Sequence, residues 1–253
     1  MHSKVIGLLT DFGHHDAYVG VMKAVIFSQC PKVHIIDISH EVPPFSIAGA
    51  AFIMRGVFRF FPRNSIFVCV VDPGVGSSRL PIVLKSQGYY WVGPDNGIFP
   101  AILETNKWED AIVIKTPITK LVSSTFHGRD IFAPVAGQLV KGVPLNRLGF
   151  PLKKWAVDTI QTPQPSSSGY KGEILWIDHF GNAITNFTKQ HFSNGRKIYV
   201  GNKQISIYSY YTAVPIHHLL GIWGSQGYLE ISSSRGSASK QLHLKVGQTL
   251  FLK

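Results

Sequence analysis

The sequence predicts a two-part α/β fold, with an N-terminal, mostly parallel sheet flanked by helices and a smaller C-terminal all-β, barrel-like domain. In the first half of the chain, short apolar runs alternate with segments of helical periodicity, the pattern of strands joined by right-handed crossovers. Beyond about residue 160 the pattern becomes that of short consecutive strands. A stretch rich in Pro and Ser separates the two, so we expect domains at 1–160 and 170–253 joined by a linker at 161–169.

Apolar spacing places the elements of the first domain. Strands are expected where apolar residues run together, and helices where they recur three or four positions apart. In chain order the expected elements are a strand at Val5–Thr10, a helix capped by Asp16 with apolar positions Tyr18, Val21, Met22, Val25 and Ile26, a strand at Val33–Ile38, a helix with Ile47, Ala51, Met54 and Phe58, a strand at Ile66–Val71 and a helix at Ile131–Leu139.

The second domain is expected to consist mainly of strands. The expected strands are Ile174–Ile177, Lys197–Val200, Gln204–Tyr208, Tyr228–Ile231 and Thr249–Leu252. The pair Gly201-Asn202 lies between two of them and is typical of a hairpin turn.

Composition limits the class of protein. The chain has 253 residues, of which 45% are hydrophobic, and this excludes a disordered or low-complexity chain. Its first apolar run, Val5–Leu9, is too short for a signal peptide, and no stretch reaches the roughly 18 apolar residues of a membrane span. We therefore expect a cytoplasmic protein with no membrane partner, in which Cys30 and Cys69 are buried thiols rather than a disulfide.

The charge of the chain suggests a second class of function. Lys and Arg number 25 against 14 Asp and Glu, and residues 179–253 hold 8 of the basic side chains but one acid, Glu230. Such a balance is typical of proteins that bind nucleic acid or an anionic surface. These basic residues are scattered and do not alternate with aromatic ones, so nucleic-acid binding is kept as an alternative only.

Carboxylates follow the ends of the predicted parallel strands, where ligands bind in open α/β sheets. Asp16, Asp37 and Asp95 are interpreted as caps or turn residues. Asp72 differs because a proline and two glycines shape its loop and because Arg79, seven residues later, can hold its carboxylate ionised. The pattern alone leaves open whether this pair is structural or functional.

Two further polar clusters mark candidate sites. His127 lies beside Gly128 in the loop before an expected helix, where it can face a pocket or simply cap the helix. Asp178, Phe180 and Asn182 can hold an ammonium group, stack on a heterocycle and satisfy both edges of a base, or they can form an ordinary turn. The 11 histidines show neither HExxH spacing nor another metal-ligand pattern, so no metal site is expected.

Six motifs, spread over nearly the whole chain, point to a family. They are Thr10-Asp-Phe-Gly13 with Asp16 and Tyr18-Val-Gly-Val-Met-Lys23, Val71-Asp-Pro-Gly-Val-Gly-Ser-Ser-Arg79, Gly93-Pro-Asp-Asn-Gly97, Thr125-Phe-His-Gly-Arg-Asp130, Asp178-His-Phe-Gly-Asn182 and Gly224-Ser-Gln-Gly-Tyr-Leu-Glu230. In type and order they resemble the S-adenosyl-L-methionine hydroxide adenosyltransferases, relatives of the fluorinase and chlorinase.

This resemblance implies an activity, an assembly and a set of residues. It implies hydrolysis of S-adenosyl-L-methionine to adenosine and L-methionine without a cofactor, by a homotrimer that binds substrate between the α/β domain of one subunit and the β domain of its neighbour. It implies that Asp72, Arg79 and His127 position and polarise the attacking water. The substrate-binding residues that it implies are Asp11 at the ribose hydroxyls, Phe45 and Phe126 in the pocket wall, Asp178 at the methionine ammonium, Ser225 at its carboxylate, Phe180 and Tyr211 beside adenine, Asn182 and the backbone near Arg235 at the adenine edge, and Glu230 in the last motif. Family members often carry Asn where this chain has Ser234.

Two positions favour hydrolysis over halide transfer. The halogenases have tyrosine where this chain has Asp72, and the fluorinase has its halide-contacting serine where this chain has Gly128. Because a carboxylate in a dry pocket repels a halide, water is the expected nucleophile. With an unperturbed pKa of about 6.5, His127 is the expected base and Asp72 the orienting acceptor. A halogenase, and a protein that binds S-adenosyl-L-methionine without turnover, are the alternatives.

Overall fold

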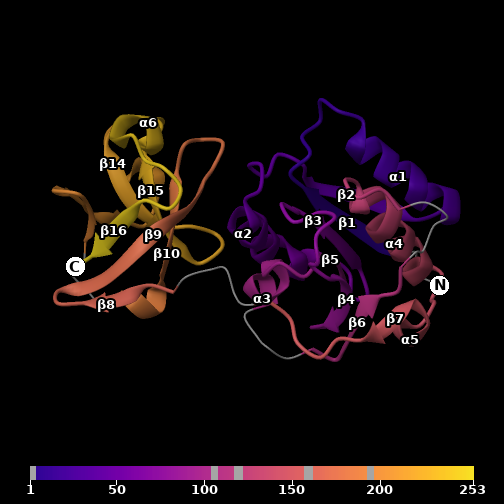
Figure 1. Cartoon of the computed structure of the whole chain (residues 1–253). Helices are drawn as coiled ribbons and strands as arrows, with labels where there is room; N and C mark the ends of the chain where they lie inside the picture. The colour runs from indigo at the N-terminus through magenta and orange to yellow at the C-terminus, as the bar shows by residue number, and fades with distance from the viewer. Residues whose placement is uncertain (1–3, 104–107, 117–121, 157–161, 193–196) are drawn as a thin grey trace. The chain divides into compact units, whose positions relative to one another are not determined.

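The chain forms two compact units, residues 1–160 and 161–253, which are described separately. A computed structural model describes residues 4–103, 108–116, 122–156, 162–192 and 197–253 (Figure 1). Within these ranges, none of the helices is both long and apolar enough to span a membrane.

The first unit is built on a seven-stranded sheet in the order β2-β1-β3-β5-β4-β6-β7. Five strands run in one direction, whereas β4 and β7 run against them, so the prediction of a mostly parallel sheet is confirmed. The strands are β1 Val5–Thr10, β2 His34–Ser39, β3 Ile66–Val70, β4 Pro81–Ser86, β5 Tyr89–Pro94, β6 Asp110–Ile114 and β7 Gly149–Pro151. The helical segments are α1 Tyr18–Gln29, α2 Ile47–Val57, η1 Phe58–Phe60, α3 Ile98–Leu103, η2 Gly128–Phe132, α4 Ala133–Val140 and α5 Leu145–Leu148.

Helices cover both faces of this sheet (Figure 1). Strand side chains alternate between faces, so in β3 Val68 and Val70 join a core with α1 and α4, whereas Phe67 and Cys69 join a core with α2 and α3. Cys69 and Cys30 are both buried and free of disulfides, as predicted. The sheet is therefore packed on both faces, and its strand ends carry the loops of the candidate site.

Helix α1 differs from its prediction in its cap and its buried face. Its N-cap is Ala17, and no side chain makes a capping hydrogen bond, so the prediction of a cap at Asp16 is wrong. The buried residues of α1 are Val19, Met22 and Ile26. Because nearly every residue of this helix is apolar, spacing alone did not single out the face that packs.

The second unit is a nine-stranded, barrel-like sheet, as predicted. Its path is β12-β11-β16-β9-β10-β15-β14-β13, with β8 paired to β9. The strands are β8 Gln164–Ser166, β9 Gly169–Ile177, β10 Ala183–Thr188, β11 Ile198–Val200, β12 Lys203–Ile205, β13 Ile207–Tyr208, β14 Leu219–Trp223, β15 Tyr228–Ser233 and β16 Thr249–Leu252, and the helical segments are η3 Lys189–His191, η4 Tyr211–Ala213 and α6 Ala238–Leu242.

The edges of this second sheet are brought together by the chain itself. The edge strands β12 and β13 are separated by one residue, Ser206, so the sheet curls until it is nearly closed. The predicted hairpin at Gly201-Asn202 joins β11 to β12. The stretch 161–169, expected to be a linker, contains β8, which pairs with β9; residue 161 lies outside the described residues.

Candidate active site

A cleft of the first unit lies where the loops after β1 and β3 meet the loop before η2. We call this cavity of about 430 Å³ the first cleft. Its lining residues are Asp11, Phe12, Tyr18, Pro44, Phe45, Val70, Asp72, Val75, Thr125, Phe126, His127 and Gly128. It thus gathers five of the residues named from the sequence, and a sixth, Arg79, contacts two of them.

Arg79 joins Asp72 to His127 at the wall of the first cleft. Its Nε lies 3.0 and 3.1 Å from the two carboxylate oxygens of Asp72, and its Nη2 lies 2.5 Å from Asp72 Oδ2. The same Nη2 lies 2.5 Å from His127 Nδ1. The Asp72 and Arg79 side chains are 5% and 9% exposed, so water screens this ion pair poorly.

The contact with Arg79 fixes the tautomer of His127. A guanidinium can only donate, so His127 Nδ1 must accept, and a neutral imidazole then carries its proton on Nε2. Burial, helped by the Arg79 charge, lowers the pKa of His127, so the ring is neutral at pH 7. With Nδ1 engaged, His127 offers a hydrogen-bond donor rather than a free lone pair.

A π-helical turn positions His127 and Gly128. The helix predicted at Ile131–Leu139 begins earlier, because η2 starts at Gly128 and leads directly into α4. Asp130, inside this turn, accepts a 2.8 Å hydrogen bond from the backbone of Ser123 and so ties the loop to the helix. Single π turns are frequent at functional sites.

Gly76 is the point at which the Asp72 loop meets the His127 loop. Its φ is +77°, and a Cβ there would collide with the backbone oxygen of Ser124. We expect Gly76→Ala to push the loops apart, lowering kcat at least about tenfold and the free energy of unfolding by about 1–3 kcal/mol. Steady-state kinetics and urea unfolding measure the two effects.

Gly142→Ala is the matched control for this prediction. Gly142 has φ +83° but no atom within 4 Å of an added Cβ, so its replacement brings backbone strain without a collision. An equal loss of kcat in both variants would contradict a role for the Gly76 contact in holding the two loops.

Three aromatic rings form one wall of the first cleft. Phe126 packs edge-on against Tyr18 at 5.1 Å and Phe12 at 6.0 Å between ring centroids, and Phe12 lies 5.6 Å from Tyr18. Sequence reasoning named Phe126 but missed Phe12 and Tyr18 as lining residues, although both stand in the first motif. This apolar wall lies beside the buried Asp72 and Arg79 charges.

Asp11 holds the rim of the first cleft. Its Oδ2 accepts a 2.8 Å hydrogen bond from the backbone nitrogen of Phe45. Phe45 has φ +67°, a conformation that is uncommon for a residue with a Cβ, and the residue is 70% exposed. The Asp11 contact therefore helps to keep an aromatic side chain at the mouth of the cavity.

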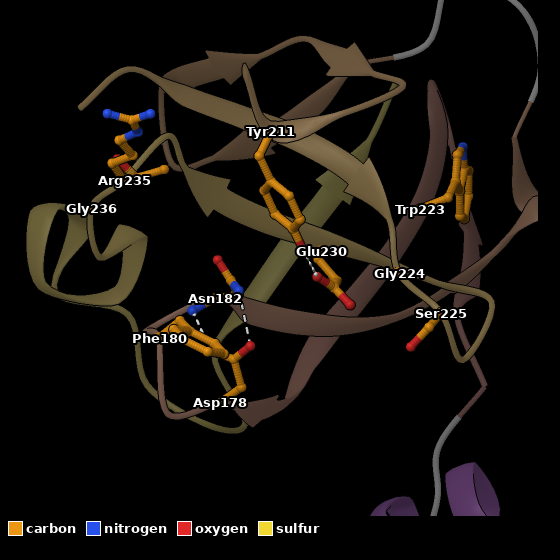
Figure 2. Close-up of a pocket in the computed structure, with 11 residues that line it drawn as sticks. Asp178, Phe180, Asn182, Tyr211, Trp223, Gly224, Ser225, Glu230, Arg235 and Gly236 are labelled. Atoms are coloured by element: carbon orange, nitrogen blue, oxygen red, sulfur yellow. Dashed lines mark hydrogen bonds between the residues drawn. The ribbon is translucent and has the colours of Figure 1, made fainter. Parts of the chain in front are cut away.

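The second unit contains a separate cavity of about 800 Å³, which we call the second cavity (Figure 2). Its lining residues are Asp178, Phe180, Asn182, Tyr211, Trp223, Gly224, Ser225, Glu230, Ser233, Arg235 and Gly236. All seven residues named from the sequence for this domain are among them. Trp223, Ser233 and Gly236 were missed, since none of the three lies in a motif that the sequence analysis singled out.

Asp178 and Asn182 lock one end of the second cavity. The Asp178 carboxylate accepts hydrogen bonds from the backbone nitrogen and from Nδ2 of Asn182, at 2.8 and 2.9 Å. Phe180 lies in the turn between them, lines the cavity and is 73% exposed (Figure 2). The motif therefore forms a turn, and the side chains of that turn also line the cavity.

Glu230 and Tyr211 meet in the middle of the second cavity (Figure 2). Tyr211 Oη donates to Glu230 Oε2 at 3.3 Å. Burial raises the pKa of Glu230 despite this hydrogen bond, and burial followed by the Glu230 charge raises the pKa of Tyr211 to about 12. Gly224 leaves the space that the carboxylate fills, since a Cβ there would collide with Glu230 Oε1.

The second cavity is lined by two carboxylates, Asp178 and Glu230, and by one basic side chain, Arg235. Among the described residues, no basic side chain lies within ion-pair distance of Asp178 or Glu230. Two partly buried carboxylates without a cationic partner favour a positively charged ligand.

Comparisons with known proteins identify the family of this chain. The model of the SAM hydroxide adenosyltransferase N-terminal domain matches residues 6–149, and that of the C-terminal domain matches residues 172–251. A Thermus thermophilus protein named (R)-S-adenosyl-L-methionine hydrolase is 34% identical over 96% of this chain and 97% of its own, and an Actinoplanes fluorinase is 25% identical over 97% and 96%. The crystal structure of an uncharacterized conserved protein from Thermotoga maritima is 37% identical, with a TM-score of 0.90 over 98% of this chain and 99% of that one. This chain therefore belongs to the SAM hydroxide adenosyltransferase family.

Proposed function

We propose that this protein hydrolyses S-adenosyl-L-methionine to adenosine and L-methionine by attack of water on the ribose 5′ carbon. The observation that carries the proposal is the Arg79 guanidinium bridging Asp72 and His127 at the wall of an aromatic cleft. Family membership and relatives named as hydrolases at 34% identity support it. The reaction needs only water beside the substrate.

Asp72 and His127 divide the handling of water between them. His127 donates from Nε2 to the water oxygen, because its Nδ1 already accepts from Arg79. Asp72 accepts a water proton, since a carboxylate has lone pairs beyond those that Arg79 occupies. This assignment reverses the expectation from unperturbed pKa values, in which His127 was the base.

A weak base is sufficient for this chemistry. Water becomes strongly acidic as its oxygen bonds to the 5′ carbon, so the proton passes to Asp72 late in the step. The C5′–S bond breaks as the C5′–O bond forms, and methionine leaves as a neutral thioether. The positive charge of the sulfonium is dispersed in the transition state, which a dry site favours.

Recognition of the substrate uses the carboxylates of both cavities. Asp11 accepts from the ribose hydroxyls, and Asp178 holds the methionine ammonium, with Ser225 at the methionine carboxylate. Phe180 and Tyr211 flank adenine while Asn182 contacts its edge. The unpaired charges of Asp178 and Glu230 support a ligand that carries a sulfonium and an ammonium.

Gly128 supports water rather than halide as the nucleophile. An added Cβ at Gly128 would lie 3.0 Å from Met22 Sδ and 3.3 Å from Phe126 Cε2, which is tight. The serine that contacts halide in the fluorinase therefore has little room here. The Asp72 carboxylate, 5% exposed, repels an anion at the same place.

Product analysis tests the proposal. Protein incubated with each sulfonium epimer of S-adenosyl-L-methionine in H₂¹⁸O should give methionine and adenosine in equal amounts, with ¹⁸O on the 5′ carbon; relatives' names specify the R epimer. A chlorinated nucleoside formed with added chloride would instead identify a halogenase. Tight binding of S-adenosyl-L-methionine without turnover would identify a binding protein. If the protein did not bind S-adenosyl-L-methionine but bound nucleic acid in a salt-sensitive way, the nucleic-acid-binding alternative would be favoured.

The pH dependence of kcat tests the role of His127. Because its pKa is lowered, the His127 ring stays neutral to below pH 6.5. Once the ring is protonated, Nδ1 becomes a donor that faces the Arg79 donor, and their hydrogen bond is lost. We expect kcat to fall as the pH falls through this lowered pKa, which gives the pH profile an acid limb. In His127→Asn, which keeps an acceptor near the position of Nδ1 but cannot titrate, this acid limb should disappear. These rates are measured at saturating substrate, so that protonation of Glu230, which affects substrate binding, does not contribute to the pH dependence of kcat. An unchanged acid limb in His127→Asn would assign it to another group.

We infer further that the protein acts as a homotrimer in the cytoplasm, as the resemblance implies. Phe45 and Phe180, 70% and 73% exposed at the mouths of their cavities, support burial by another surface. Light scattering after size exclusion should give about three times the chain mass of 28.0 kDa, and a monomer mass would contradict the assembly.

A further inference from the structure

A buried polar pair, Thr10 and His40, lies behind the first cleft. Thr10 ends β1 with no exposed surface, and His40, just after β2, is 1% exposed. Thr10 Oγ1 lies 2.8 Å from His40 Nδ1. Burying such groups is costly unless they are hydrogen-bonded, and apolar side chains could fill the same space without that cost.

The pair continues outward through two charged side chains. His40 Nε2 lies 3.0 Å from Asp37 Oδ1, an electrostatic contact without a well-aligned hydrogen bond, and Lys23 Nζ lies 2.5 Å from Asp37 Oδ2. Asp37 is thus an ion-pair partner, and its interpretation as a cap was wrong. Because an ionised carboxylate can only accept, Nε2 carries the imidazole proton and Nδ1 accepts from the Thr10 hydroxyl.

A β-bulge brings His40 beside Asp37. The pairing of β1 with β2 shifts by one residue, from Leu8 opposite Asp37 to Leu9 opposite Ser39. In a regular strand, residues three apart point to opposite faces of the sheet. The extra residue therefore allows the side chains of Asp37 and His40 to lie on the same side and contact each other. Bulges commonly re-aim side chains beside active sites.

This line of residues holds the backbone that carries Asp11. Thr10 Oγ1 accepts from Phe12 N at 3.3 Å, and the His40 carbonyl accepts from Gly13 N at 2.8 Å. Asp11 lies between these two anchors, and its carboxylate accepts from Phe45 N. A shift of the loop would therefore move both the Asp11 carboxylate and the Phe45 ring.

We propose that Lys23, Asp37, His40 and Thr10 form a positioning relay that fixes Asp11 for binding the ribose hydroxyls. This inference rests on the proposed function, which places ribose at Asp11. The four side chains are positioning residues, because they act on the ligand only through Asp11. A purely structural role would affect folding stability but not the selectivity of the site for hydroxyls.

Paired ligands separate these two roles. Dissociation constants of the full-length protein for adenosine and for 2′,3′-dideoxyadenosine are measured by calorimetry in wild type, Thr10→Val, Thr10→Ser and Asp11→Ala. We expect wild type to prefer adenosine at least about tenfold, Thr10→Val to reduce that preference to about threefold or less, and Thr10→Ser, which keeps the hydroxyl, to retain it. In the Asp11→Ala background, Thr10→Val should change the ratio no further.

Each outcome bears on a different claim. A wild-type ratio in Thr10→Val, even with a lower Tm, would overturn the relay and leave the proposed function intact. No preference for adenosine in wild type would refute the ribose contact at Asp11, and the relay with it. If Thr10→Val does not fold, Lys23→Met provides a second variant, because Lys23 lies at the partly exposed outer end of the relay. An unchanged ratio of the two dissociation constants in Lys23→Met would count against the relay in the same way.

Discussion

Asp72→Asn should lower kcat at least about 100-fold while changing KM less than about threefold. The amide has nearly the shape of the carboxylate but cannot take a proton from water. Asp72→Ala and His127→Ala should each cause a loss of similar size. Steady-state kinetics over a range of substrate concentrations separate kcat from KM.

The matched control is Asp110→Asn, at the exposed start of β6, which should leave both constants unchanged. Turnover close to wild type in Asp72→Asn and His127→Ala together would remove both residues from the mechanism. A rise in KM with unchanged kcat would instead make Asp72 a binding residue.

Arg79→Met should reduce both turnover and stability. It leaves the Asp72 carboxylate, 5% exposed, without its cation, and removing one partner of such a buried pair costs about 3–5 kcal/mol. It also releases His127 Nδ1, so kcat should fall at least about 100-fold. Urea unfolding and kinetics report the two losses.

The double variant Arg79→Met with Asp72→Asn tests the physical cause. Neutralising Asp72 removes the unpaired charge, so the double variant should be more stable than Arg79→Met alone but no more active. If the two stability losses simply added, the ion pair would not be the source of the cost.

The strands predicted from the sequence are apolar runs, although other apolar strands, β4, β6 and β14 among them, were not predicted. The predicted β16 agrees with the structure at both ends, and β1 does as well, because each is an apolar run with clear borders. Strand β10 was missed because Thr185 and Asn186 interrupt its pattern, although both are buried. Their side chains bond to backbone groups, Thr185 to the Leu229 carbonyl and Asn186 to the Glu173 nitrogen, so polar residues are stable where the pattern predicts apolar ones.

The candidate site was predictable in membership but not in protonation. The motifs named Asp72, Arg79 and His127 without indicating which atoms meet. Only the fold reveals that one guanidinium nitrogen contacts both neighbours, which fixes the imidazole tautomer. The line from Lys23 to Thr10 was hidden for a similar reason, since a β-bulge aligns residues that a regular strand would separate.

The fit of Glu230 against Gly224 has a consequence for how these positions evolve. A Cβ at 224 would collide with the Glu230 carboxylate and displace it, so a side chain at 224 and the present position of the carboxylate exclude each other. The two positions should therefore covary among relatives, with a larger residue at 224 found only where the glutamate is absent. A change at 230 can come first and by itself, whereas a side chain at 224 would move the carboxylate, so Gly224 preserves the position of this negative charge for as long as Glu230 is retained.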